Sequence, residues 1–101
     1  MASHRDRPAP ARPVAMTGSD QQIATGATIV FGIGMSDDGT GTVHAHIYDG
    51  TDNTGTLICG VTPPNGGHSN LWFGPNGIDC PNGVRLEMVS GTASGAVYIA
   101  Q

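Results

Sequence analysis

The chain has 101 residues, of which 16 are glycine and 12% are charged, and its formal net charge is −4. This length fits a single domain, and low charge with abundant glycine favours a rigid, turn-rich β protein over a disordered one. No run of 18 apolar residues is present, which excludes a membrane-spanning helix. No secretory signal is visible, so we expect a protein made in the cytoplasm with reduced cysteines.

The net charge conceals two oppositely charged regions. Residues 1–12 carry Arg5, Arg7 and Arg12 against Asp6, for a charge of +2. Residues 13–101 carry one arginine against seven acidic side chains, for a charge of −6. An acidic body repels phosphate groups, so we do not expect the folded part to bind nucleic acid.

Residues 1–22 are predicted to form an extended arm, and residues 23–101 the domain proper. Three prolines between residues 5 and 16 favour extended backbone. A disordered terminal tail is the plainer alternative, although such a tail does not need the apolar side chains that follow the last of these prolines. We predict that the arm binds a partner through its guanidinium groups and these apolar residues: Arg5, Arg7, Arg12, Val14 and Met16.

From residue 27 onward apolar side chains alternate with small or polar ones, which is the period of a β-strand. A first strand over residues 27–36 is expected to share one face among Ile29, Phe31, Ile33 and Met35. After a turn containing an Asp-Gly pair, the next strand is expected to point Val43, Ala45 and Ile47 inward and His44, His46 and Tyr48 outward.

The rest of the chain continues this pattern of short strands and turns. Leu57, Cys59 and Val61 are expected together on one strand, Leu71 and Phe73 opposite Trp72 on another, and Val84, Leu86, Met88, Val97 and Ile99 inward on the last two. Six or seven strands with turns about every 10 residues predict an all-β fold with essentially no helix. The architecture expected is a small antiparallel β-sandwich or barrel.

His44 and His46 are two residues apart on a strand, so their imidazoles share a face. Such a pair suits a zinc ion when a third ligand is supplied by a neighbouring strand or by subunits around a three-fold axis. His68, Asp49 and Asp52 are the candidate third ligands. The plainer interpretation, an exposed polar face, is favoured, and no cofactor or metal is predicted.

Two other features have structural explanations. The loop at residues 49–55 resembles a calcium loop but lacks the EF-hand register and its closing glutamate, so local Asx and Thr turns are preferred. Cys59 and Cys80 could close a disulfide, but two buried thiols are favoured because the protein is expected to be cytoplasmic. No catalytic motif is present, and the polar residues are spread over loops, so we do not expect an enzyme.

Tyr48, Trp72 and Tyr98 are predicted interface residues, since all three fall on faces opposite the main core and aromatic side chains anchor interfaces. A core built from about 80 residues is thin, and such domains commonly gain stability by oligomerisation. A homo-oligomer is therefore expected, with a trimer favoured.

The segments YDGTDNTGTLI (48–58) and FGPNGIDCPNGVRLEMVSGTASGAVYI (73–99) resemble small all-β virion proteins of tailed bacteriophages. Such proteins show a strand ending in Y-D/N-G-T, a T-G-T-L-I strand, a pair of N-G turns and S-G-T before a last apolar strand. The resemblance covers roughly residues 40–100. It implies a head-decoration (cement) subunit, or a neck- or tail-attached subunit, with an arm that reaches along neighbouring subunits.

The leading hypothesis is therefore a non-enzymatic virion protein that decorates and stabilises an assembled shell, with the phage major capsid protein or other virion proteins as partners. The alternative is a small module that binds carbohydrate or a cell surface through Trp72, Tyr48 and the loop residues Asp49, Asp52 and Asn53.

Overall fold

The computed structural model describes residues 10–37 and 41–101, and all the regular structure among them is β-strand. No helix in these residues is long and apolar enough to cross a membrane. The strands are β1 (Arg12–Ala15), β2 (Gln21–Thr25), β3 (Thr28–Asp37), β4 (His44–Asp49), β5 (Thr56–Val61), β6 (His68–Trp72), β7 (Ile78–Cys80), β8 (Gly83–Ser90) and β9 (Ala93–Ala100).

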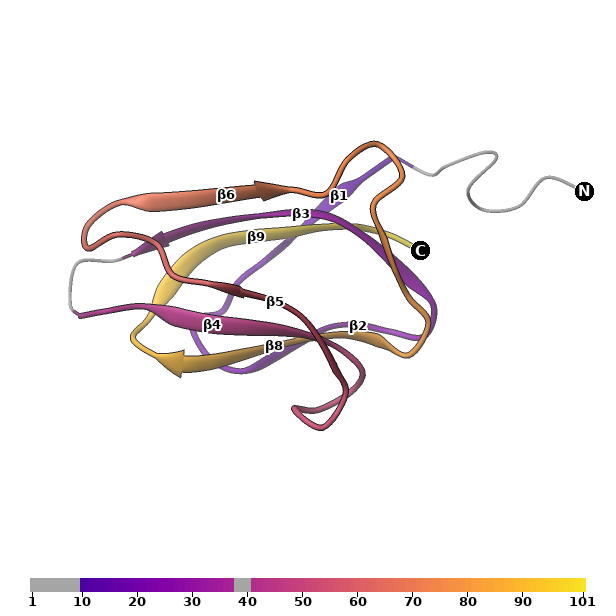
Figure 1. The fold of residues 1–101 in the computed structure, drawn as a ribbon, viewed down its shortest axis with the longest axis horizontal. Helices are drawn as coiled ribbons and strands as arrows, with labels where there is room; N and C mark the ends of the chain where they lie inside the picture. The colour runs from indigo at the N-terminus through magenta and orange to yellow at the C-terminus, as the bar shows by residue number, and fades with distance from the viewer. Residues whose placement is uncertain (1–9, 38–40) are drawn as a thin grey trace, which may run out of the picture.

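The strands form two antiparallel sheets that face each other (Figure 1). Sheet A has the order β1-β9-β3-β6, with β7 pairing beside β6 along β3, and sheet B has the order β2-β8-β4-β5. The chain crosses from one sheet to the other several times, which ties the two layers together. The predicted β-sandwich is confirmed.

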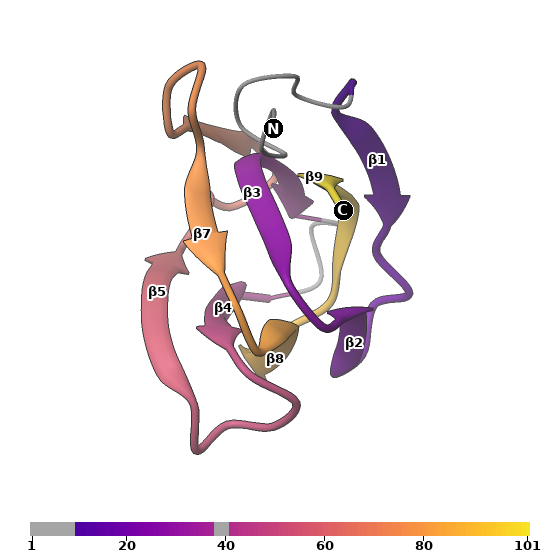
Figure 2. The ribbon, with the colours of Figure 1, turned by 90° about the vertical axis from the view of Figure 1, so that its right-hand side faces the viewer.

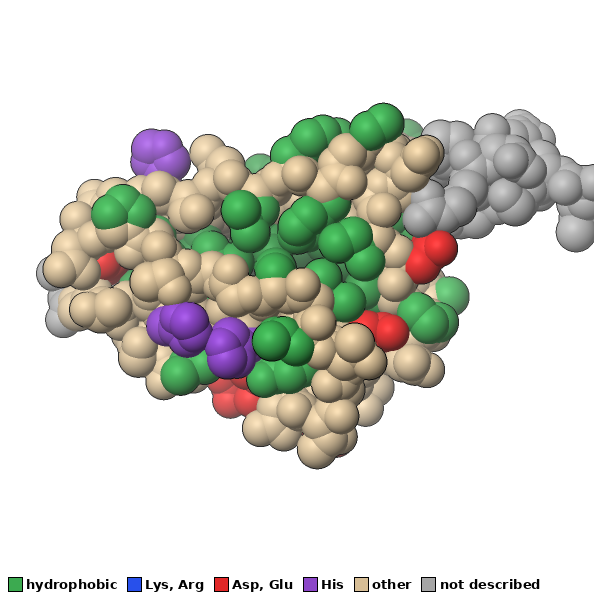
Figure 3. All heavy atoms as spheres, in the orientation of Figure 1, with side chains coloured by type: hydrophobic (Ala, Val, Ile, Leu, Met, Phe, Trp, Pro, Cys, Tyr) green, Lys and Arg blue, Asp and Glu red, His purple; other side chains and the backbone are tan. Residues whose placement is uncertain are grey.

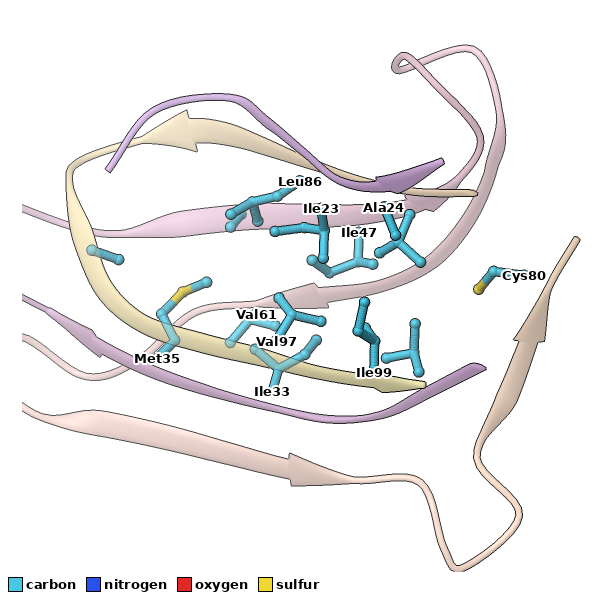
Figure 4. Packing of buried hydrophobic residues seen from close by; sticks show 14 of the residues in the cluster. Ile23, Ala24, Ile33, Met35, Ile47, Val61, Cys80, Leu86, Val97 and Ile99 are labelled. Atoms are coloured by element: carbon cyan, nitrogen blue, oxygen red, sulfur yellow. The ribbon is translucent and has the colours of Figure 1, made fainter. Parts of the chain in front are cut away.

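The core lies between the sheets and is built from the alternate residues of their inner faces. Figure 4 shows Ile47, Leu86 and Ile23 of sheet B meeting Ile33 and Val97 of sheet A. The predicted inward positions of β4, β8 and β9 are confirmed: Val43, Ala45, Ile47, Val84, Leu86, Val97 and Ile99 are fully buried, and Met88 packs against them.

The face predicted for residues 27–36 is right for Ile33 and Met35 but wrong for Ile29 and Phe31, because β3 contains a β-bulge. Val30 pairs with Ile99 and Gly32 with Tyr98, so one extra residue, Phe31, is inserted on β3. A bulge shifts the alternation of side chains by one residue. Val30, Ile33 and Met35 therefore enter the main core, whereas Ile29 and Phe31 form a separate apolar cluster with Ala100.

The side predicted for Leu57 on β5 is wrong, because β5 also contains a β-bulge. Ile47 pairs with Cys59 and Tyr48 with Leu57, which leaves Ile58 as the extra residue. Cys59 and Val61 pack toward the core as predicted, but Leu57 falls on the outer side and is 51% exposed.

The segment predicted as an arm supplies two edge strands of the sandwich. β1 pairs with β9 along Arg12–Ala15, and β2 pairs with β8, so the boundary drawn at residue 22 falls inside β2. Figure 2 shows β1 at the edge of sheet A beside β9. The missed strands are short and rich in alanine, glutamine and proline, and they become strands because each completes the edge of a sheet.

Candidate binding surfaces

The outer side of sheet A carries a surface that we call the aromatic face: Phe31, Gly32, Trp72 and Tyr98. Gly32, on the central strand β3, is the register partner of both Trp72 on β6 and Tyr98 on β9. The two aromatic side chains therefore stand on either side of a residue that has none.

The aromatic face combines a buried base with exposed rings. Phe31 is buried, and its ring stacks under that of Trp72, with centroids 6.2 Å apart and an angle of 21° between the planes. Trp72 is 66% exposed and Tyr98 is 41% exposed. Leu71 packs toward the core while Trp72 points outward, as the alternation predicted. Exposure of two large aromatic side chains on one sheet face marks a surface suited to a partner.

Glycine is required in the floor of the aromatic face. A Cβ atom on Gly32 would lie 2.5 Å from the carbonyl oxygen of Leu71 and 3.3 Å from Cε3 of Trp72. Two residues on, a Cβ atom on Gly34 would lie 3.1 Å from Oδ1 of Asn70. Backbone and side-chain atoms of β6 thus lie close over β3 at these two glycines.

The outer side of sheet B carries a second surface, which we call the histidine row: Thr62, His44, His46 and Tyr48. The prediction that His44, His46 and Tyr48 point outward together is confirmed, since the alternating residues of β4 are buried. Nε2 of His44 lies 2.9 Å from Nε2 of His46. Nδ1 of His44 lies 2.7 Å from Oγ1 of Thr62, and Nδ1 of His46 lies 3.2 Å from the hydroxyl of Tyr48.

An ion pair borders the histidine row on β8. Glu87 is the register partner of His46, and Arg85 is the partner of Tyr48. Nε of Arg85 donates a hydrogen bond to Oε2 of Glu87, and both side chains are mostly buried. The charges of this pair therefore compensate each other beside the imidazoles.

The third ligands proposed for a zinc site do not join the histidine pair. His68 lies on β6, in the other sheet. Within residues 10–37 and 41–101, no three side chains of His, Cys, Asp or Glu lie close enough together to hold a metal ion. A site on the histidine row would therefore have two protein ligands from this chain.

The loop after β4 is held by turns, as predicted. Oδ1 of Asp52 accepts hydrogen bonds from the amide and the hydroxyl of Thr54, and these lower the pKa of the Asp52 carboxyl. Oδ1 of Asp49 accepts a hydrogen bond from the amide of Asn82 at 2.9 Å. Asp52 thus stabilises its own turn, whereas Asp49 connects the loop to the turn between β7 and β8.

Cys59 and Cys80 are free thiols. Cys80 is fully buried in the core, and Cys59 is half-buried. Burial raises the pKa of the Cys59 thiol, and burial together with the nearby carboxylates of Asp49 and Asp79 raises the pKa of Cys80 to about 11. Both thiols are thereby kept in the protonated, weakly nucleophilic form.

The predicted partner-binding residues of the arm separate into three groups. Arg5 and Arg7 lie outside the described residues. Val14 and Met16 pack against the core of their own domain. Arg12 is exposed on β1, and its Nη2 donates a hydrogen bond of 3.3 Å to the side chain of Gln101.

The structure brings Trp72 and Tyr98 onto one face but places Tyr48 on the other side of the sandwich. The sugar-binding set of Trp72, Tyr48 and the residue 49–55 loop is therefore not assembled. The position of Phe31 beneath Trp72 was not predicted; Gly32 and Gly34, which follow Phe31, are the sequence signal for this floor. No protein-family model, curated protein or solved structure matches this chain.

Proposed function

We propose that this chain is a non-enzymatic structural subunit of a bacteriophage virion, and specifically a head-decoration subunit that attaches to the assembled shell. The partner is the major capsid protein or another virion protein. The subunit binds as a homo-oligomer, with a trimer favoured. The resemblance of residues 48–58 and 73–99 to small all-β virion proteins supports this class of protein.

The observation that carries the proposal is the aromatic face. Trp72 is 66% exposed and Tyr98 is 41% exposed, and both stand on the outer side of sheet A across Gly32. Aromatic residues at the centre of a surface patch are the typical anchors of protein–protein interfaces. The occupant we propose is a flat, apolar surface of the shell.

Charge supports a role for the N-terminal segment in the same attachment. Residues 1–12 carry a charge of +2, whereas the rest of the chain carries −6. Arg5 and Arg7 suit carboxylates of a neighbouring subunit, because guanidinium groups bind carboxylates in a bidentate manner. Neighbouring copies of this acidic chain and an acidic shell surface both offer such groups.

The proposal is tested by measuring whether purified phage particles contain this chain. Phage particles from cells that carry the gene are purified on a density gradient, and the chain is quantified against the other particle proteins by mass spectrometry. We expect a fixed ratio to the shell protein, with immunogold label on the heads. Absence from the particles contradicts the proposal, and label on the neck or tail replaces the head location by a neck- or tail-attached one.

Variants identify the attachment surface. Trp72→Ala and Tyr98→Ala should lower the copy number per particle at least about tenfold. Leu57→Ala is the matched control, because Leu57 is similarly exposed but lies on the outer side of sheet B. Full occupancy by the Trp72→Ala protein would show that the aromatic face does not mediate attachment.

A second candidate function, carbohydrate binding, is supported by the same face. Two exposed aromatic rings across a glycine floor suit the apolar faces of sugar rings, and here the pair is Trp72 and Tyr98. Binding on a glycan array that is lost in Trp72→Ala, together with absence from particles, would favour this function over the first.

A further inference from the structure

We propose that the histidine row binds one divalent transition-metal ion, with Nε2 of His44 and Nε2 of His46 as its two protein ligands and water in the remaining positions. Copper(II) is the preferred ion. This site is independent of the aromatic face and of the proposed attachment to a shell.

The spacing of the two nitrogens is the first argument. The two Nε2 atoms are 2.9 Å apart, and the ring planes are 76° from each other. Two nitrogens bound to one ion at about 2.05 Å lie about 2.9 Å apart when the bonds make a right angle, and about 3.3 Å apart in a tetrahedron. The spacing therefore matches adjacent positions of a square or tetragonal site, the geometry typical of copper(II) and nickel(II).

The second argument is how the rings are held. Nδ1 of each histidine has its own hydroxyl partner, Thr62 for His44 and Tyr48 for His46. Metal-binding histidines usually use the second ring nitrogen in this way, which fixes the ring and leaves the first nitrogen for the ion. The histidine row thus supplies both the ligands and the groups that orient them.

A metal ion can replace the hydrogen bond between the two Nε2 atoms, because the hydrogen of that bond has another position on the same ring. In the hydrogen bond between the two Nε2 atoms, one of them carries a hydrogen and the other accepts it. When an ion binds both, that hydrogen moves to Nδ1 of the same ring. A hydroxyl can accept as well as donate, so its partner accommodates the new Nδ1–H without a change of position. The ion can therefore bind both Nε2 atoms without release of a proton to the solvent.

The residue paired with His46 on the neighbouring strand β5 has no side chain. Gly60 is the register partner of His46 on β5, and a Cβ atom there would lie 3.4 Å from Cδ2 and 3.8 Å from Nε2 of His46. Both rings are half-buried, and Figure 3 shows histidine side chains together on this face. The charged groups beside them on β8, Arg85 and Glu87, are bonded to each other, so the arginine charge is compensated.

The experiment is a titration of the full chain with copper(II) followed by calorimetry, with His4→Ala in every protein so that this residue outside the described part supplies no imidazole. We expect one ion per chain. His44→Gln and His46→Gln should each weaken binding at least about tenfold. The matched control is His68→Gln, which removes an imidazole from the other sheet and should leave affinity unchanged.

Two further measurements distinguish copper bound by His44 and His46 from copper bound elsewhere on the protein. Electron paramagnetic resonance of the copper(II) protein should show coupling to nitrogen that is reduced in both single variants. Thr62→Val and Tyr48→Phe, which keep both ligands, should weaken binding by roughly tenfold through loss of ring orientation. Circular dichroism shows whether each variant is folded. Absence of binding, or an equal loss in the His68→Gln control, overturns the proposal.

Discussion

The two outer faces of the sandwich use exposed positions in opposite ways. On sheet A the outward positions around Gly32 carry the exposed rings of Trp72 and Tyr98, and the ring of Phe31 stacks beneath Trp72. On sheet B, beside the exposed Leu57, outward polar side chains bind one another, in the histidine row and in the pair of Arg85 with Glu87. One face therefore leaves apolar area to be covered by another molecule, whereas the other satisfies its polar groups itself and offers two converging nitrogens.

The largest effect on stability is expected at the base of the aromatic face. Phe31→Ala should lower the free energy of unfolding by about 3 kcal/mol, because it removes a buried ring. Trp72→Ala should cost less than about 1 kcal/mol, since that side chain is 66% exposed. Urea unfolding measures both values. Equal losses would mean that Trp72 is structural and not free to bind a partner.

A somewhat smaller loss is expected when sheet A loses its edge strand. A chain that starts at Thr17 lacks β1 and the contacts of Val14 and Met16 with the core. Compared with a chain that starts at Pro10, it should be less stable by about 2 kcal/mol, the hydrophobic and hydrogen-bond contributions being offset in part by chain entropy. Equal unfolding midpoints for the two truncated chains would contradict the role given to β1.

Matched glycine substitutions compare the two faces directly. Gly32→Ala should cost about 2 kcal/mol, because the new Cβ atom meets the backbone of β6 at 2.5 Å and forces the strands apart. Gly60→Ala, beside the histidine row, should change stability by no more than about 0.5 kcal/mol, since its nearest contact is 3.4 Å. Thermal unfolding of the two variants measures this difference. A greater loss of stability for Gly60→Ala than for Gly32→Ala would contradict the expectation.

The smallest effect concerns Cys80, in the core that both faces share. The pKa of its thiol is about 11 in the folded chain and is expected near 8.5 in the unfolded one. Its contribution to stability is therefore complete below pH 8.5 and declines as the pH rises toward 11, because the unfolded chain loses this proton first. Unfolding midpoints between pH 8 and 11 should fall more steeply for the natural chain than for Cys80→Ala. Parallel curves would contradict this shift in the thiol pKa.

Period-two alternation and turn residues predicted most of the fold. The inward residues of β4, β8 and β9 and the outward positions of the histidines and Trp72 follow from local pattern alone, because each strand buries one face. This reasoning failed at the bulges of β3 and β5. Nothing local in residues 27–36 distinguishes a regular strand from one with a bulge at Phe31, since both faces there are apolar and both are buried.

What the sequence by itself determined is the all-β class of the fold and which side chains of β4 share a face. Only the tertiary structure decided that β1 and β2 close the edges of the sheets, that Trp72 and Tyr98 meet across Gly32, and that Tyr48 lies on the opposite side. The physical reason is that alternation acts between neighbours in the chain, whereas sheet order and register depend on hydrogen bonds and packing between strands far apart in sequence. The aromatic face and the histidine row become surfaces only when those strands are side by side.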